Sequence, residues 1–309
     1  MTEPRTATPA PPAPLTHGLW GVLATPFHGS DLAVDVTSLR REVEHYLTVP
    51  ADGLVVLGVF GEGASLDTAE RRTVVAAVAE TAPDTPLVVG LSARATAVAA
   101  EQGRQALDAA GRPVSLMLLV NSADPGRLAA HLHAVHDATG AGVVLQDYPE
   151  TSGVRIGADA VLDVLERCPF VAAVKSEAPP TSVAIGRLTA ATSVPVFGGL
   201  GGVGLLDELA AGAAGAMTGF SHPEGLRAAI DAHAAGGFVA AREAFAPWLP
   251  LVNYEAQPGI GLAVRKEILR RRGLFADGAV RPPAAPAPAE ILSLLPAHLE
   301  EVSDGPAAA

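Results

Sequence analysis

A lysine stands at the end of an apolar stretch typical of a strand buried on both faces, Val171-Ala-Ala-Val-Lys175-Ser-Glu177. Only one other lysine, Lys266, occurs among the 21 basic residues, so the remaining 19 are arginines. A neutral lysine amine forms a Schiff base with a carbonyl substrate, which arginine cannot do. An apolar environment favours this chemistry because it lowers the ammonium pKa from about 10.4. The structural alternative is an ion pair with Glu177, two residues on and therefore on the same strand face.

Eight short apolar runs alternate with segments of helical period, which predicts an α/β fold of the (β/α)8 TIM barrel type. The expected strands are Trp20–Ala24, Gly53–Leu57, Leu87–Gly90, Ser115–Val120, Gly142–Gln146, Val171–Lys175, Val194–Phe197 and Ala214–Thr218. The expected helices are Val36–Leu47, Thr68–Glu80, Ala95–Ala109, Pro125–Thr139, Ala158–Cys168, Pro180–Ala190, Gly204–Ala211 and Pro223–Ala234. A doubly wound sheet is less favoured, because Thr25-Pro26-Phe27 follows the first strand where a glycine-rich phosphate loop would be expected.

The chain is expected to have three parts: a disordered tail over 1–17, the barrel over 18–236 and a C-terminal helical extension over 237–303. The tail is rich in proline, alanine and threonine and lacks the apolar core of a secretory signal. The extension contains helical patterns near Phe238–Leu251, Gly259–Arg272 and Ala287–Val302. Lys266 lies in the middle one among several arginines, including Arg265, and we interpret these residues as a solvated helix face.

Composition excludes several classes of partner. The net charge of −12 argues against nucleic acid and anionic membranes, and no apolar run reaches the ~18 residues of a membrane span. The single cysteine, Cys168, excludes an intrachain disulfide and agrees with a cytoplasmic location. His131, His133 and His136 share one predicted helix without a supporting carboxylate, so we expect a solvated face, no metal and no other cofactor.

Barrel enzymes place their catalytic residues where the strands end, at the C-terminal rim. Polar residues and glycines stand at the predicted ends: Thr25, Gly58 to Glu62, Asn121, Gln146, Asp147, Tyr148, Lys175, Glu177, Gly198, Gly199 and Thr218. Glycine-flanked turns expose N–H groups that can hold a carboxylate. An imine-forming lysine beside such a turn describes a site for a 2-oxo acid. The run Gly198–Gly202 reads as a close-approach loop, with a phosphate site as the weaker option.

Taken together, these motifs resemble the dihydrodipicolinate synthase / N-acetylneuraminate lyase family of class I aldolases and dehydratases. The markers are Gly21-Val-Leu-Ala-Thr25-Pro26-Phe27, Gly58-x-x-Gly61-Glu62-x-x-x-Leu66-x-x-x-Glu70, Tyr148-Pro149 followed by Gly153, Val174-Lys175, Arg272-Gly273 and Arg281-Pro282. The resemblance implies a barrel with a C-terminal helical extension and a homo-oligomer, a tetramer or a dimer. It also implies a Schiff base between Lys175 and pyruvate or another 2-oxo acid, whose carboxylate is held at the turn after the second strand.

The chain departs from the family pattern at the positions that carry proton transfer. The usual Gly-Thr-Thr-Gly-Glu is Gly58-Val59-Phe60-Gly61-Glu62 here, so both hydroxyls are lost. The usual Tyr-Asn-x-Pro places Gln146 at the catalytic tyrosine position, and Tyr148, two residues later, is a possible substitute. Thr151 stands where dihydrodipicolinate synthase has the arginine for its second substrate. We therefore do not expect a true dihydrodipicolinate synthase.

The remaining pattern is similar to the branch that acts on 2-keto-3-deoxy sugar acids. The predicted catalytic residues are Lys175, Gln146, Glu177 and Tyr148, with Glu177 as the first candidate acid and base or, alternatively, only an ion-pair partner. The predicted substrate-binding residues are Thr25, Gly58, Val59, Phe60, Gly61, Asp147, Gly198 and Met217. Asp147 has a structural alternative as a turn residue, and Phe60 either contacts the substrate or plugs the barrel mouth.

Three hypotheses about function follow. The first is a Schiff-base lyase, aldolase or hydro-lyase, acting on a small 2-oxo acid. The second is a catalytically degenerate family member that binds a 2-oxo acid as a sensor or partner subunit, which the lost hydroxyls motivate. The third is a barrel enzyme that binds phosphate at Gly198–Gly202.

Overall fold

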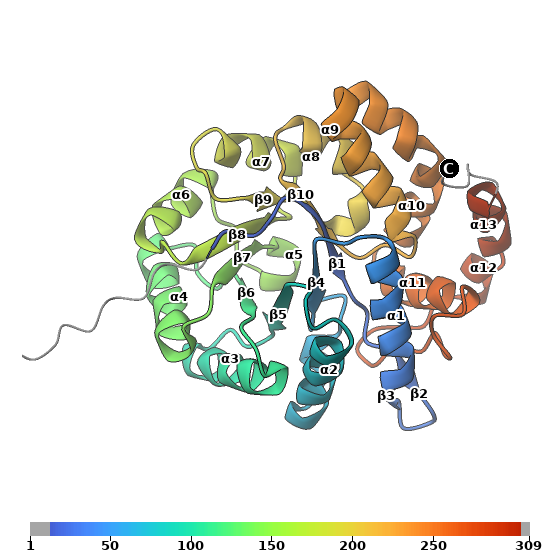
Figure 1. Ribbon diagram of the computed structural model, residues 1–309, viewed down its shortest axis with the longest axis horizontal. Coiled ribbons are helices and arrows are strands. Elements are labelled where there is room, and N and C mark those ends of the chain that lie inside the picture. The colour runs from blue at the N-terminus through green and yellow to red at the C-terminus, as the bar shows by residue number, and fades with distance from the viewer. Residues whose placement is uncertain (1–12, 304–309) are drawn as a thin grey trace, which may run out of the picture.

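The computed structural model describes residues 13–303, and its centre is a closed barrel of eight parallel strands (Figure 1). The strands follow the order β10-β1-β4-β5-β6-β7-β8-β9, and a parallel bridge between Gly198 and Ala216 joins the two ends. Their bounds are β1 Gly18–Val22, β4 Gly53–Val56, β5 Leu87–Leu91, β6 Ser115–Leu119, β7 Val143–Asp147, β8 Val171–Ser176, β9 Val196–Phe197 and β10 Gly215–Thr218. The predicted (β/α)8 barrel is therefore confirmed.

A ring of helices surrounds the strands, one after each of them (Figure 1). These are α1 Val36–Thr48, α2 Thr68–Thr81, α3 Thr96–Ala110, α4 Pro125–Thr139, α6 Ala158–Arg167, α7 Thr181–Thr189, α8 Leu205–Ala210 and α9 Pro223–Phe245. The predicted capping box is present at the start of α2, where the side chains of Asp67 and Glu70 each accept from the other's backbone N–H. Two small elements were not predicted, the hairpin β2 Phe27–His28 with β3 Ala33–Val34 and the short helix α5 Pro149–Ser152.

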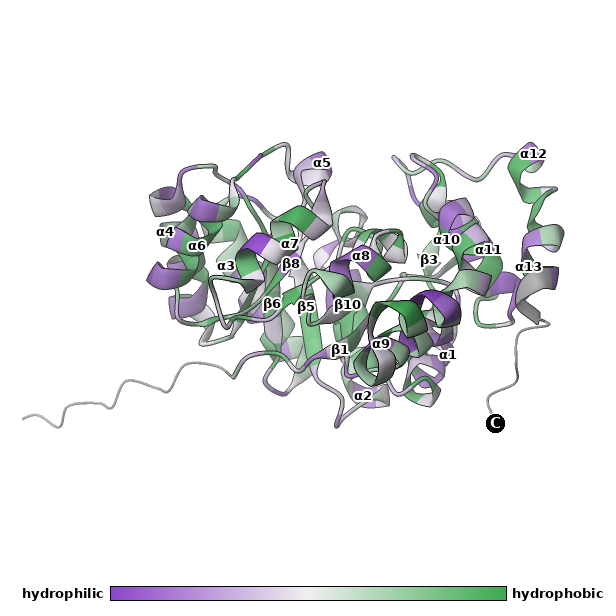
Figure 2. Ribbon diagram, turned by 90° about the horizontal axis from the view of Figure 1, so that it is seen from above, coloured by the Kyte–Doolittle hydropathy of each residue, from purple (hydrophilic) through white to green (hydrophobic). Residues whose placement is uncertain are grey.

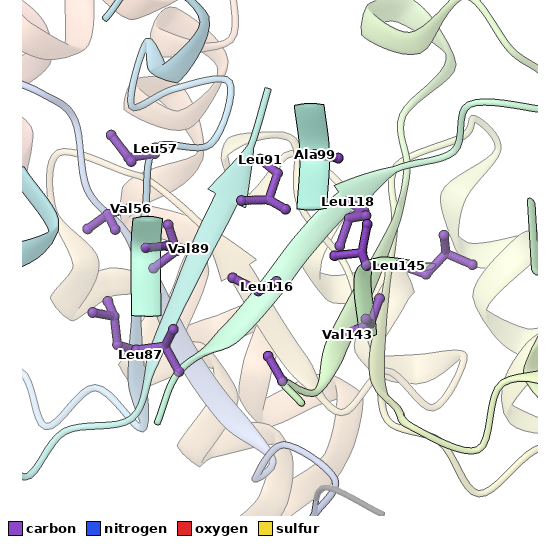
Figure 3. Close-up of a cluster of buried hydrophobic side chains, with 14 of the residues drawn as sticks. Val56, Leu57, Leu87, Val89, Leu91, Ala99, Leu116, Leu118, Val143 and Leu145 are labelled. Atoms are coloured by element: carbon purple, nitrogen blue, oxygen red, sulfur yellow. The ribbon is translucent and has the colours of Figure 1, made fainter. Parts of the chain in front are cut away.

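The strands separate two apolar layers, which explains why their sequences are apolar at successive positions. The outer layer joins strands to helices and includes Val56, Val89, Leu118 and Leu145 (Figure 3). The inner layer fills the barrel with Trp20, Val22, Val55, Val88, Met117, Val144, Ala173, Phe197 and Met217. Figure 2 shows largely hydrophobic strands inside helices that carry polar residues on their outer faces.

The C-terminal extension follows directly on the last helix of the barrel. The boundary expected after residue 236 coincides with a kink in α9, where Gly237 has a non-helical φ of +70° before the helix resumes and runs to Phe245. The chain then forms α10 Leu249–Glu255, α11 Gly261–Arg271, α12 Ala289–Leu292 and α13 Leu295–Ser303, with α12 and α13 standing to one side of the barrel (Figures 1 and 2). The helix breaks at this residue because glycine alone adopts this backbone conformation without strain.

Two cations of α11 are buried, so the predicted solvated face is wrong for them. Lys266 has no exposed surface, forms an ion pair with Glu62 and donates to the carbonyl oxygen of Ala279 at 3.0 Å. Arg265 is 3% exposed, and its Nε donates to Glu255 Oε2 at 2.8 Å. The helix is covered by the barrel rim, and Glu62 lies 204 residues away in sequence, beyond the reach of helical spacing rules.

The histidines of α4 do not share one environment. His131 is buried, with Nδ1 2.9 Å from Thr96 Oγ1, so the prediction of a solvated face is wrong for this residue. His133 and His136 lie against the ring of Phe170, which is stacked on His136 at 4.0 Å. Between residues 13 and 303, no three histidine, cysteine or acidic side chains come together in a way that could hold a metal.

The predicted tail, residues 1–17, falls mostly outside the described residues, which begin at 13. Within the described part, Leu15 donates its N–H to Ala172 O at 3.0 Å and packs against the inner apolar layer. This contact attaches the segment before β1 to the amino end of β8. In the same described range, no helix is both long enough and apolar enough to cross a membrane.

Candidate active site

Lys175 lies on the inner face of β8, two residues beyond Ala173 of the barrel interior. Its Nζ is 3.3 Å from Glu177 Oε1, and the two side chains are only 7% and 5% exposed. In the neighbouring strand β7, Gln146 is paired with Lys175 in register. Strand geometry therefore brings three of the four predicted catalytic residues together at the carboxyl end of the barrel.

Glu177 is held from two sides. Gln146 donates from Nε2 to Glu177 Oε2 at 2.7 Å, and the N–H of Leu200 donates to Oε1 at 3.1 Å. With the lysine, three donors surround the two oxygens, an arrangement that suits an ionised carboxylate. Glu177 therefore lies at the centre of the site and joins β7, β8 and the loop after β9.

The loop after β9 is close-packed, as the glycine run predicts. A Cβ on Gly199 would lie 2.2 Å from Glu177 Oε1, and one on Gly198 would lie 1.7 Å from Glu208 Oε2. Several N–H groups of this loop are already used, among them that of Gly201, which donates to Thr218 Oγ1 at 2.8 Å. Gly202 likewise donates to the oxygen of Gly199 at 3.0 Å. These bonds disfavour the alternative of a phosphate site.

Glu208 is a second buried carboxyl beside the site, and sequence reasoning missed it. It lies on α8, is 1% exposed and accepts a hydrogen bond from Thr181 Oγ1 at 2.7 Å. Burial, with a smaller contribution from the charge of Glu177, raises its pKa to about 7. The paired glycines indicated that some group approaches the loop, but no spacing rule linked them to Glu208.

Asp147 and Tyr148 follow Gln146 and lie near Glu177. Strand alternation places Asp147 beside Leu145 on the outer face, where burial and then the charge of Glu177 raise its pKa to about 6. Its Oδ1 is buried without a hydrogen-bond partner in the described part of the chain. Burial first, and Glu177 next, also raise the pKa of Tyr148, whose hydroxyl bonds to Thr151.

The turn after β4 is compact because its glycines contact backbone. A Cβ on Gly61 would lie 2.9 Å from the nitrogen of Leu57, and Leu57 itself has a φ of +58°. Thr25 donates from Oγ1 to the oxygen of Gly61 at 2.6 Å, so the end of β1 fixes this turn. The predicted substrate-binding residues Thr25, Gly58 and Gly61 are thus neighbours at one side of the rim.

A cavity of about 140 Å³ opens beside this turn. It is lined by residues that follow or end four successive strands: Leu57, Gly58, Val59, Ala64, Gly90, Leu91, Ser92, Arg94, Met117, Leu119, Gln146 and Thr151. Gln146 belongs both to this cavity and to the contacts of Glu177. The cavity therefore borders the lysine–carboxylate pair through Gln146, although neither Lys175 nor Glu177 lines it.

The two apolar candidates have different positions. Phe60 packs against the barrel interior, and the Arg265 guanidinium lies 4.0 Å from its ring centroid, so this side chain covers the interior as a plug does. Met217 has no exposed surface and lies within the inner apolar layer near Phe197. Sequence analysis missed Arg265 here because nothing in the pattern of α11 points it toward the rim.

The fold and the site define an eight-stranded α/β barrel with a buried lysine and its carboxylate partner at the catalytic rim. A sequence model of the Dihydrodipicolinate synthetase family matches residues 15–302, and the chain belongs to that family. It is therefore a lyase of the aldolase and dehydratase class. The resemblance inferred from the motifs is thereby confirmed.

Individual relatives carry two kinds of name. The chain is similar to a 4-hydroxy-tetrahydrodipicolinate synthase of Kineococcus radiotolerans, 31% identical over 98% of both chains. It is similar to an L-2-keto-3-deoxyarabonate dehydratase of Azospirillum brasilense, 28% identical over 87% of this chain and 89% of the other. Among solved structures, a dihydrodipicolinate synthase of Rhodopseudomonas palustris covers 94% of this chain and 99% of its own, with 29% identity and a TM-score of 0.86.

Proposed function

We propose that the protein is a Schiff-base-forming lyase that acts on a pyruvate-type 2-oxo acid and is not a dihydrodipicolinate synthase. The contact between Lys175 and Glu177 on the inner face of β8 carries this proposal. A dehydratase of 2-keto-3-deoxy sugar acids is the form we favour. Its support is the relative named as such a dehydratase, together with Thr151 in place of the arginine that the synthase reaction requires.

The proposed reaction begins when the neutral Nζ of Lys175 attacks the keto carbon. The keto oxygen leaves as water, and the imine takes up one proton from solvent, which its final hydrolysis returns. The resulting iminium withdraws electrons from C3. Glu177 takes a proton from C3, which gives an enamine, and a β-hydroxyl then leaves with a returned proton as a second water. Hydrolysis of the imine consumes one water and frees Lys175. Proton transfer by a positioned carboxylate contributes typically ~10²–10⁴ in rate.

The other site residues have supporting roles in this proposal. Gln146 holds Glu177 in place through the 2.7 Å hydrogen bond, and Tyr148 is the second candidate for proton transfer. The turn from Gly58 to Gly61, with Val59 and Phe60, would receive the carboxylate of the substrate beside Thr25. Asp147, Gly198 and Met217 stay predicted contacts of the substrate or its immediate surroundings.

The test is reductive trapping. Borohydride with pyruvate or a 2-keto-3-deoxy acid should attach the acid to Lys175, and peptide mass spectrometry should find Lys266 unmodified. Lys175→Ala is the blank. Release of pyruvate, measured beside formation of the semialdehyde, separates aldol cleavage from dehydration. If neither pyruvate nor any 2-keto-3-deoxy acid tested modifies Lys175, the proposal is wrong.

A degenerate family member that binds a 2-oxo acid as a sensor or partner subunit is the second candidate. The observation in its favour is Gln146 at the position of the family tyrosine, where an amide cannot transfer a proton. It predicts an adduct at Lys175 without turnover.

The proposal also includes a homo-oligomer, either a tetramer or a dimer, and a cytoplasmic location. Light scattering after size exclusion measures the oligomeric state.

A further inference from the structure

The cavity beside Gln146 contains a single charged residue among the described residues that line it, Arg94. Two hydroxyl side chains, Ser92 and Thr151, line the same space, and most of the remaining lining is apolar. No carboxylate lines it. This cavity, which Gln146 joins to the catalytic pair, is therefore electropositive, although the chain as a whole carries a net charge of −12.

The backbone of Arg94 is held by a hydrogen bond, whereas its side chain has no polar partner in the described structure. Asn121 donates from Nδ2 to the carbonyl oxygen of Arg94 at 3.1 Å, which ties the loop after β5 to the loop after β6. Its guanidinium makes no hydrogen bond or ion pair within residues 13–303, and the residue is exposed. By contrast, nearby Arg71 donates to Ser92 Oγ at 2.9 Å, and Arg72 lies 2.6 Å from Asp108.

We propose that Arg94 binds an anionic group at the end of the substrate remote from its keto carbon. The inference rests on the proposed function, because it takes the lysine end of the site as the place of the keto group. The inference restricts the class of substrate to 2-oxo acids that carry a second carboxylate. Gln146 lies between the two ends: it contacts Glu177 beside Lys175 and also lines the cavity with Arg94.

The chemistry of the cavity favours a carboxylate over a neutral polyol chain. A guanidinium presents paired N–H donors that match the two oxygens of a carboxylate, and Ser92 and Thr151 supply hydroxyls beside it. A chain of hydroxyls would be satisfied by Ser92, Thr151 and Gln146 and would leave the charge of Arg94 without a partner. Arg94 is exposed, so water solvates its charge in the free protein, and a second anionic group would replace that water with a charge-assisted contact.

The experiment compares two 2-oxo acids of equal length, 2-oxopentanedioate and 2-oxopentanoate, which differ in the remote carboxylate. Half-saturation of borohydride trapping at Lys175 is measured for the wild type, Arg94→Ala and Arg94→Lys. The matched control is Arg127→Ala, an exposed arginine on α4 whose side chain makes no hydrogen bond or ion pair in the described structure. Arg94→Ala should raise half-saturation for the diacid about 10- to 100-fold, as loss of a charge-assisted contact does, and leave the monoacid unchanged.

Three results would overturn the inference. Arg94→Ala could raise half-saturation equally for both acids, raise it for neither acid, or raise it for the diacid no more than Arg127→Ala does. Preference for a 2-oxo acid with a terminal phosphate over the diacid would overturn the assignment of a carboxylate. Calorimetric binding of the diacid to Lys175→Ala protein separates the two proposals, because Arg94-dependent binding there supports this inference even when no acid can be trapped.

Discussion

Gly199 and Glu177 approach so closely that a Cβ on the glycine would lie 2.2 Å from the carboxylate oxygen Oε1. The same oxygen is 3.3 Å from Lys175 Nζ and accepts the N–H of Leu200. The absence of a side chain at residue 199 therefore fixes where the carboxylate sits relative to the amine. Catalysis by a positioned base depends on this distance.

Substitution Gly199→Ala should displace Glu177 and lower kcat by about 10²-fold, the scale expected when a general base is misplaced. Trapping of a 2-oxo acid at Lys175 should persist, since the amine keeps its place on β8. Gly157→Ala is the control, because that glycine has an ordinary φ and open space around it. Equal activity of the two variants would show that the glycine contact does not position the carboxylate.

The buried pair between Lys266 and Glu62 should be far more costly to break than an exposed ion pair. Lys266→Met would leave Glu62 charged and buried, and we expect a loss of about 3–5 kcal/mol in the free energy of unfolding, measured with urea. Arg40→Ala, at a pair that is 48% and 65% exposed, should cost under about 1 kcal/mol. The double variant Glu62→Gln with Lys266→Met should recover part of the loss. A Lys266→Met variant as stable as Arg40→Ala would contradict this account.

Much of the barrel was predictable because its signals are local. Strands buried on both faces read as apolar runs, and the position of Lys175 at the end of one of them indicated both the rim and the chemistry. The capping box at Asp67 predicted the first residue of α2, Thr68, correctly. Alternation along β8 then placed Glu177 on the face of Lys175, as the structure has it.

The parts that sequence reasoning missed depend on contacts between distant elements. Glu208, Arg94 and Arg265 reach the site from α8, the loop after β5 and α11, and no periodicity relates them to Lys175. Burial of Lys266 was missed for the same reason, because a run of basic residues on a helix reads as solvated unless its partner is known. Tertiary packing of the C-terminal helices on the barrel rim decides these positions.

Gln146 should position the general base, Glu177, and should not affect the amine of Lys175. In Gln146→Met the 2.7 Å hydrogen bond to Glu177 is lost while the side-chain volume is kept, so kcat should fall about 10- to 100-fold. Formation of the adduct at Lys175 should continue at a similar half-saturation. Gln105→Met on α3 is the matched control, because it removes a hydrogen bond between a glutamine and a glutamate, Glu101, away from the site. A parallel loss of trapping and turnover would instead assign Gln146 to substrate binding.

Glu42 should make the folded protein less stable as the pH rises from 4.5 to about 8. This side chain of α1 is 2% exposed, its Oε1 accepts the N–H of Ala24 at 3.2 Å, and burial raises its pKa to about 8 from an ordinary 4.5. Between those values the folded protein keeps a proton that the unfolded chain releases. The stabilisation that this proton gives the folded state is therefore complete below pH 4.5 and is lost as the pH rises through 8. Over that range the free energy of unfolding falls by at most about 1.4 kcal/mol per pH unit.

Replacing Glu42 with glutamine removes this titration and keeps an acceptor for the N–H of Ala24. The Glu42→Gln variant should match the wild type in urea unfolding near pH 5 and exceed it in stability near pH 9. Glu44→Gln, an exposed substitution two residues away on α1, should leave the difference between the two pH values unchanged. If Glu42→Gln and wild type lose stability in parallel as the pH rises, the buried carboxyl is already ionised in the folded protein at neutral pH.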